Sequence, residues 1–147
     1  MMRLSTKGRY AARFMLELAL HYANGNMLLK DIARRQGISE GYLEHIVPPL
    51  RAAGLVNSVR GAGGGYALAR PPAEIDLKEI VLLMEGSLSP AECIDNSGAC
   101  KRSPYCVTQD VWRELGEKIS ETLESITLKD LAQKHIEKEE KHLIYHI

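Results

Sequence analysis

Apolar residues recur every three or four positions over the first fifty residues, which indicates helices with one buried face. The first stripe predicts a helix capped by Ser5 or Thr6. A short helix over 29–36 and a tight turn at Gly37 follow, and Ser39 can cap the next helix. The two longer stripes consist of Tyr10, Phe14, Leu18 and Tyr22, and of Leu43, Ile46, Leu50 and Ala53. This order of elements predicts a helix-turn-helix.

A hairpin is predicted after this helix pair. Residues 55–60 and 66–69 are predicted strands, and the glycine-rich run 61–65 between them can adopt the positive φ angles of a hairpin tip. The Pro48-Pro49 pair inside the second helix predicts a kink near Val47, because proline removes backbone donors. The hairpin therefore adds a wing to the helix-turn-helix.

The second half of the chain contains a long apolar stripe. Asp76 can cap a short helix, and the segment 86–102 shows little helical pattern. Ser103-Pro104 predicts the start of a long helix. A helix with so long an apolar face exceeds what a small domain can cover, so we predict self-association. The stripe consists of Val107, Val111, Leu115, Ile119, Leu123 and Ile126.

The predicted fold is mainly α with a small β-wing, a winged helix-turn-helix plus a long dimerisation helix. We divide the chain into four parts along these lines. They are a DNA-binding domain at 1–85, a cysteine-containing loop at 86–103, a dimerisation helix with a short following helix at 104–132, and a charged C-terminal tail at 133–147.

Charge is balanced over the whole chain but not within it. The 147 residues contain 19 Lys and Arg against 19 Asp and Glu. Residues 1–70 hold 10 basic against 4 acidic side chains, a net of +6, and residues 71–147 hold 9 against 15, a net of −6. A basic half that coincides with a winged helix-turn-helix indicates double-stranded DNA as a partner.

The second helix of such a pair enters the DNA major groove with its N-terminal residues at the base edges. Glutamate there can accept from cytosine amino groups, and Arg60 on the wing suits a narrow minor groove. The exposed positions near the helix start are Ser39, Glu40, Gly41, Tyr42, Glu44 and His45. Phosphate contacts are predicted for Lys7, Arg9, Arg13, Arg34, Arg35 and Arg51.

The cysteines form the second candidate site. All three, Cys93, Cys100 and Cys106, lie within one short polar segment with the spacing C-x6-C-x5-C. Thiolates are the soft ligands that hold iron–sulfur clusters and zinc, and clustered cysteines in a reducing compartment favour metal or redox chemistry. A zinc site and a disulfide switch remain as alternatives.

Other functions have less support. The glycine run lacks the Gly-Lys-Ser/Thr ending of a phosphate loop, and we find no convergent catalytic set, so an enzyme is not expected. His142 and His146 could share a helix face but lie in a charged segment typical of solvated histidines. No apolar stretch is long enough to span a membrane, and no export signal is evident, so we expect a cytoplasmic location and no membrane partner.

Taken together, these motifs resemble the IscR-type family of winged-helix transcription regulators, and most closely its regulators of iron–sulfur cluster assembly. The resemblance implies a homodimer, a 2Fe–2S cluster on the three cysteines, and DNA contacts by Ser39, Tyr42, Glu44 and Arg60. Gln109 stands where the resemblance places a histidine ligand, which leaves the fourth ligand unassigned. The motifs are Arg3–Ala11, Asp31–Ala33, Gly37–Ser39, Tyr42–Glu44, Gly54–Gly61, Gly63–Tyr66, the cysteines and Trp112–Leu128.

We therefore hypothesise a transcription regulator, a repressor, that binds a pseudo-palindromic operator as a homodimer. Its 2Fe–2S cluster would report cluster status, redox state or nitric oxide. The alternative within this class is a cluster-free or zinc-binding regulator of cysteine or iron metabolism. A second class, a zinc- or disulfide-stabilised module that never touches DNA, differs in lacking salt-dependent affinity for duplex.

Overall fold

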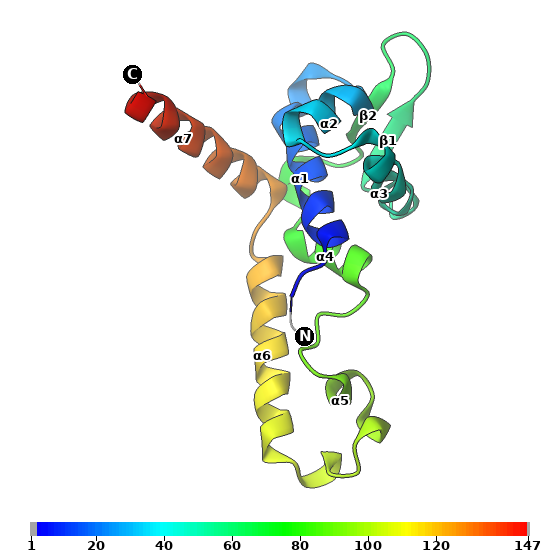
Figure 1. The fold of residues 1–147 in the computed structure, drawn as a ribbon, viewed down its shortest axis with the longest axis vertical. Coiled ribbons are helices and arrows are strands. Elements are labelled where there is room, and N and C mark those ends of the chain that lie inside the picture. Colours follow the sequence, from blue (N-terminus) through cyan, green and yellow to red (C-terminus); the bar gives the residue numbers. More distant parts are fainter. Residues whose placement is uncertain (1–2, 147) are drawn as a thin grey trace.

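The computed structural model describes residues 3–146 and consists of a helical body with two projecting helices (Figure 1). The body is a winged helix-turn-helix. It contains, in chain order, α1 (Thr6–Leu20), α2 (Leu29–Gln36), α3 (Glu40–Ala52), β1 (Val56–Val59), β2 (Gly65–Leu68) and α4 (Leu77–Glu85). The predicted class, mainly α with a small β-wing, is therefore confirmed.

Hydroxyl and carboxylate caps begin three of these helices where the sequence predicted them. Ser5 Oγ accepts from the backbone N–H of Gly8 at 3.0 Å, and Ser39 Oγ accepts from that of Tyr42 at 3.1 Å. Asp76 caps α4 through a 2.9 Å bond from the N–H of Glu79. Each cap satisfies a donor that the helix itself leaves unpaired, and so fixes where the helix starts.

The core lies where α1, α2, α3 and α4 meet the wing. The apolar stripe of α1 supplies Phe14 and Leu18, and α3 supplies Leu43 and Leu50, all at most 1% exposed. Leu128, from the far end of the chain, is also fully buried in this cluster. The helix-turn-helix is therefore held by a continuous apolar core rather than by its turn alone.

The wing is an antiparallel hairpin in which Val56 pairs with Leu68 and Val59 with Gly65. Met27 adds a bridge to the hairpin through reciprocal backbone bonds with Tyr66, of 2.8 and 2.7 Å. Gly65 is required at this point, because it has φ +131° and a Cβ there would overlap the Met27 carbonyl. The segment before α2 thus ties the wing to the helix pair.

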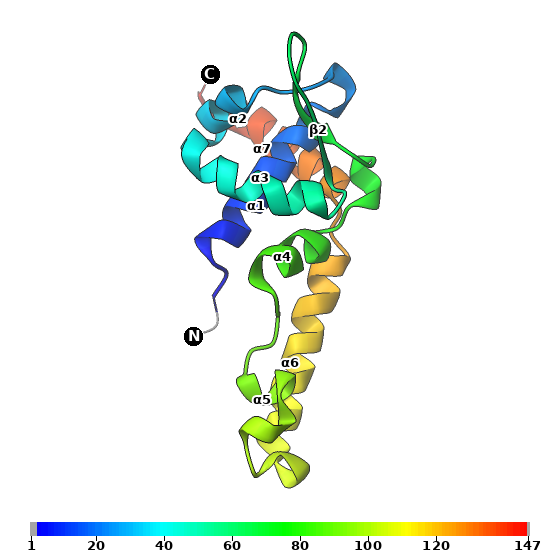
Figure 2. The ribbon, with the colours of Figure 1, turned by 90° about the vertical axis from the view of Figure 1, so that its right-hand side faces the viewer.

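The second half of the chain forms α6 (Val107–Glu124) and α7 (Leu128–His146), joined at the body by a bridge between Asp76 and Thr127. Between α4 and α6 lies an irregular segment with one short helix, α5 (Glu92–Asp95), and 3-10 turns at Ser97–Ala99 and Ser103–Tyr105. Figures 1 and 2 show this segment beside the end of α6 that lies farthest from the body.

Three local features refine or correct the sequence predictions. Helix α3 runs without a break through Pro48 and Pro49. The exposed Glu44 and His45 carry the carbonyls that lose a donor there, and water can satisfy them. Helix α6 begins at Val107, since residues 103–105 form a separate 3-10 turn instead of its first turn.

The third correction concerns the segment from residue 133, which was expected to be a tail after a short helix. It continues α7 up to His146 as far as the structure describes it. Its residues are strong helix formers, and pairs four apart support the helix. Gln133 Nε2 donates to Glu137 Oε1 and His135 Nε2 lies near Glu139 Oε1, each at 3.1 Å.

None of the helices described in residues 3–146 combines the length and apolar character needed to cross a membrane.

Candidate DNA-binding surface and cysteine loop

Helix α3 separates an apolar face from a polar one. Leu43, Ile46, Val47 and Leu50 are buried in the core. The remaining positions leave the predicted DNA-binding residues Ser39, Glu44, His45 and Arg51 exposed on the surface. Arg51 follows Glu44 by seven positions, two helical turns along the same face. The N-terminal half of α3 is therefore free to enter a groove.

Tyr42 lies at the edge of this exposed surface. Its ring meets that of Tyr10 on α1 edge-on, with centroids 5.3 Å apart and an angle of 73° between the planes. This contact leaves Tyr42 half-buried, with part of the side chain at the surface of the first turn of α3. Tyr42 is thus fixed in place by α1.

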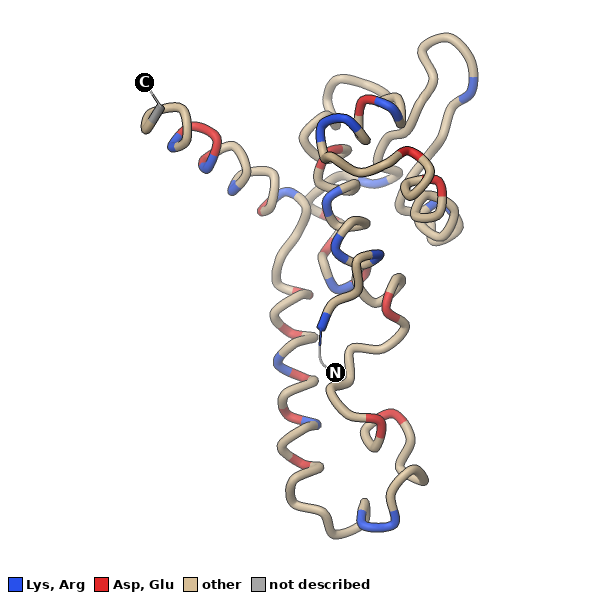
Figure 3. The backbone as a smooth tube through the Cα atoms, in the orientation of Figure 1, with Lys and Arg blue, Asp and Glu red and all other residues tan. Residues whose placement is uncertain are grey.

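Arg60 is exposed on the separate wing element, directly after β1. The tip that follows is closed by a 2.9 Å bond from Gly64 N to the Gly61 carbonyl, and Asn26 Nδ2 donates to the Gly63 carbonyl at 3.1 Å. Figure 3 shows cationic positions along α1, α2 and the wing, whereas α6 carries mostly acidic positions with a few basic ones among them. Arg60 is therefore presented by a hairpin whose tip is held to the body through Asn26.

The second candidate site is the cysteine loop, residues 86–106. Cys93 and Cys106 are half-buried and Cys100 is exposed, and all three are free thiols. All residues of this loop are described, and none of them is fully buried. Among the side chains that the structure describes, no three of His, Cys, Asp or Glu are gathered closely enough to hold a metal ion. The structure thus places the thiols in one loop without assembling them into a closed site.

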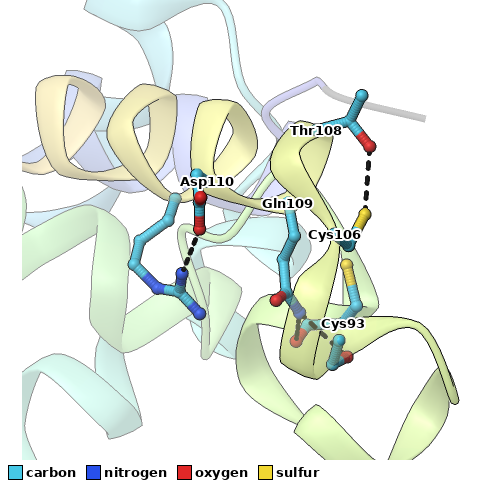
Figure 4. Close-up of polar contacts among 7 residues, drawn as sticks. Cys93, Cys106, Thr108, Gln109 and Asp110 are labelled. Atoms are coloured by element: carbon cyan, nitrogen blue, oxygen red, sulfur yellow. Dashed lines mark hydrogen bonds and ion pairs between the residues drawn. The ribbon is translucent and has the colours of Figure 1, made fainter.

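Gln109 anchors the cysteine loop to α6 (Figure 4). Its side chain is only 4% exposed, and Nε2 donates to the Cys93 carbonyl at 2.9 Å and to Ser103 Oγ at 3.0 Å. Both amide hydrogens are therefore used within the loop. Gln109 stands where the resemblance places a histidine ligand. In this structure its side chain connects the cysteine loop to α6 by hydrogen bonds.

Cys106 occupies the N-cap position of α6. Its Sγ lies 3.1 Å from Thr108 Oγ1, and Figure 4 shows this contact next to the Cys93 thiol. The Thr108 hydroxyl lowers the pKa of the Cys106 thiol, and the backbone N–H of Gln109 adds to the effect. Donors at a helix N-terminus favour a thiolate, the form that acts as a metal ligand.

Polar contacts also hold the start of the loop. Ser87 Oγ and Ser89 Oγ each donate to the Asp95 carboxylate at 2.7 Å. These hydroxyls, Ser89 first, lower the pKa of Asp95. Hydrogen bonds on an exposed segment contribute little net stability, so these contacts shape the loop more than they stabilise it.

Sequence analysis missed two features that surround these sites. The Glu85 carboxylate, at the end of α4, accepts from Ser5 N at 3.1 Å and from Ser5 Oγ at 2.5 Å, and a Cβ at Gly8 would overlap it. The guanidinium of Arg13, predicted to contact phosphate, is hydrogen-bonded to Gln36 instead. Both contacts join residues at least 23 positions apart, for which periodicity gives no signal.

A winged helix-turn-helix with an exposed α3 N-terminus on a basic body defines a DNA-binding protein. The Rrf2 profile, described as an iron-dependent transcriptional regulator, matches residues 4–134. The chain therefore belongs to the Rrf2 family of transcriptional regulators, as the resemblance implied. Members of this family are DNA-binding proteins without enzymatic activity, which confirms that the chain is not an enzyme.

Two kinds of relative are similarly close. The HTH-type transcriptional regulator IscR of Photorhabdus laumondii is 44% identical over 88% of this chain and 79% of its own length. CymR of Bacillus subtilis is 40% identical over 98% of this chain and 99% of its own length. Solved structures show the same two kinds of relative. CymR, the global cysteine regulator of B. subtilis, superposes with a TM-score of 0.78 at 40% identity, covering 91% of this chain and 98% of that one. IscR of T. potens gives 0.76 at 43% identity, covering 91% and 88%.

Proposed function

We propose that this regulator is a homodimeric, cytoplasmic repressor whose cysteine loop holds a 2Fe–2S cluster and reports iron–sulfur or redox status, including nitric oxide. The observation that carries the proposal is the loop itself. It contains all three cysteines of the chain, has no fully buried residue, and is anchored by Gln109 on the first turn of α6. A change in such a loop is passed directly to the long helix.

Operator recognition is assigned to six residues. Ser39, Tyr42, Glu44 and His45 would meet base edges in the major groove, Arg51 a phosphate, and Arg60 the minor groove. Ser39 keeps a hydroxyl proton to donate, because its capping role uses the oxygen only as an acceptor. Two copies related by a two-fold axis would bind a pseudo-palindrome with half-sites about one helical turn apart.

The apolar face of α6 supports the dimer. Val107, Val111 and Trp112 are 76%, 53% and 41% exposed in the single chain. Gln109 is the one residue of α6 that is fully buried within residues 3–146. A second α6 packed against this stripe would remove the apolar surface from water.

Three thiols match the donor chemistry of an iron–sulfur cluster, and Cys93, Cys100 and Cys106 would hold it. When bound, such a group supplies redox activity and sensitivity to oxygen and nitric oxide. Gln109 is not counted as a ligand, because a neutral amide is a poor cluster ligand beside thiolates and its Nε2 already donates to Cys93 and Ser103. Its role is to keep Cys93 near the start of α6. The description of the family as iron-dependent also favours iron over other metals.

Anaerobic purification tests the cluster. The visible absorption spectrum and iron and sulfide contents should give about two of each per chain. Replacing all three cysteines by serine should abolish both. A colourless protein without iron would refute the proposal, and stoichiometric zinc would replace it with the zinc-binding alternative.

The second candidate is a cluster-free or zinc-binding regulator of cysteine or iron metabolism. It is favoured by the CymR relative, which matches this chain over nearly the full length of both proteins. Its cysteines would then act as free thiols or as zinc ligands. The same metal analysis distinguishes the two candidates.

A further inference from the structure

Arg13 forms two hydrogen bonds to one residue inside the protein. Its Nε donates to Gln36 Oε1 at 2.9 Å, and one of its terminal nitrogens donates to the Gln36 backbone carbonyl. Gln36 is the last residue of α2, directly before the turn at Gly37. A planar guanidinium held at two points has a fixed orientation, so this pair locks the turn of the helix-turn-helix onto α1.

On the side away from Arg13, the Gln36 amide bonds to an acidic residue. Its Nε2 donates to Glu17 Oε1 at 2.7 Å, and Glu17 is only 5% exposed. Glu17 follows Arg13 by one helical turn. The amide thus lies between a cation and an anion of α1, and only a group with both an acceptor and a donor satisfies both.

The same guanidinium reaches the recognition helix through two tyrosines. The Arg13 guanidinium carbon lies 5.2 Å from the centroid of the Tyr10 ring, within cation–π range. Tyr10 in turn packs edge-on against Tyr42 in the first turn of α3. Arg13 therefore contacts the end of α2 directly and the start of α3 through Tyr10.

We infer that Arg13 is a positioning residue for DNA recognition. With Gln36 and Tyr10 it sets the orientation of α3 relative to α1, instead of neutralising a phosphate. Base readout requires side chains held to within about 0.5 Å and 10–20°, so releasing α3 lowers specificity more than general affinity. The inference rests on the recognition role proposed above for α3.

Salt dependence separates positioning from phosphate contact. Each lost phosphate contact reduces the slope of log affinity against log salt by about 0.9. A positioning residue instead lowers affinity for the preferred sequence and leaves the slope and the affinity for unrelated duplex unchanged. Gln36→Leu is the most informative second variant. Glutamine is uncharged, so replacing it cannot remove a cation that contacts phosphate.

The probes are a duplex enriched by the wild-type protein from a randomised pool and an unrelated duplex of equal length. Arg13→Lys and Gln36→Leu should each lower affinity for the enriched duplex by about tenfold, the scale of one lost base-pair preference. Combining the two should cost no more than either alone, since they break one network. Affinity for the unrelated duplex, which requires the intact fold, should be unchanged.

Arg35→Ala provides the matched control, because it removes an exposed cation from α2 beside the same turn. It should reduce the salt slope if that cation meets phosphate. The inference is overturned if Arg13→Lys binds like the wild type, or if Arg13→Ala weakens both duplexes equally with a reduced slope. If the wild type enriches no duplex at all, the recognition role of α3 fails instead, and the inference falls with it.

Discussion

Glu44 tests base reading at the scale of a single residue. It is exposed on the second turn of α3, and a carboxylate there repels phosphate, so it contributes through base contacts rather than general affinity. We expect Glu44→Ala to relax a preference of about 1–3 kcal/mol at one base pair. Selection from randomised duplex should show the change at one position of each half-site. A uniform loss of affinity across all sequences would contradict this role.

Gln109 is a residue whose loss should act locally. Gln109→Leu fills similar space but leaves the Cys93 carbonyl without its donor inside the protein, which costs about 1–3 kcal/mol. We expect faster proteolysis within residues 86–106 and little change in global unfolding, because the core lies elsewhere. Gln133→Leu, on the exposed side of α7, is the control. Equal proteolysis of the loop in both variants would show that Gln109 is no brace.

At the scale of elements, α6 carries the proposed dimer interface. Val111→Glu places a charge on the apolar stripe and should raise the dimer dissociation constant by at least about tenfold, or 1.4 kcal/mol. Sedimentation equilibrium measures it. Val59→Glu makes the same change on the wing at nearly the same exposure, 50% against 53%, and should leave the dimer intact. Dimerisation unaffected by Val111→Glu would exclude this face.

Helix α7 begins with a reciprocal cap. The Thr127 N–H donates to Asp130 Oδ2 at 3.0 Å, and the Asp130 N–H donates to Thr127 Oγ1 at 3.1 Å. The backbone and hydroxyl of Thr127 lower the pKa of Asp130 below its ordinary value of 3.8. This carboxylate therefore contributes stability that is present above that value and is lost as pH falls through the lower folded pKa.

Asp130→Ala should accordingly destabilise the protein at pH 7, and the difference from the wild type should shrink as the pH falls below about 4 and vanish below the lowered folded pKa. Urea unfolding of both proteins over this pH range measures the effect. A difference that persists at low pH would mean that the cap acts independently of its charge.

At the scale of the whole molecule, local signals were sufficient for the winged helix. The caps at Ser5, Ser39 and Asp76 and the glycine run predicted helix starts and a hairpin, since these features act within a few residues. Local signals did not predict the roles of residues whose partners lie far away in the sequence. The sequence pattern assigns Arg13 to a phosphate, but its guanidinium bonds to Gln36, whose amide in turn donates to Glu17. Gln109 resembles a substituted ligand until its contact with Cys93 is seen.

The two halves of the charge distribution belong to two parts of the fold. The basic excess of residues 1–70 lies on α1, α2 and the wing, beside the recognition helix α3. The acidic excess of residues 71–147 lies on α6, on α4 and on Glu74 and Asp76 before α4, whereas the cysteine loop and α7 each carry as many basic as acidic side chains. A net charge of zero is therefore compatible with a strongly DNA-directed surface.

The central claim is that the winged helix binds duplex DNA and that the cysteine loop reports through it. The most direct measurement is the affinity of anaerobically purified protein for its enriched duplex as a function of salt, compared with the variant in which all three cysteines are serine. We predict a log–log slope of about −0.9 per phosphate contact for both proteins, with a changed affinity for the enriched duplex in the cysteine variant. Salt-independent binding, or identical affinities in the two proteins, would contradict the account.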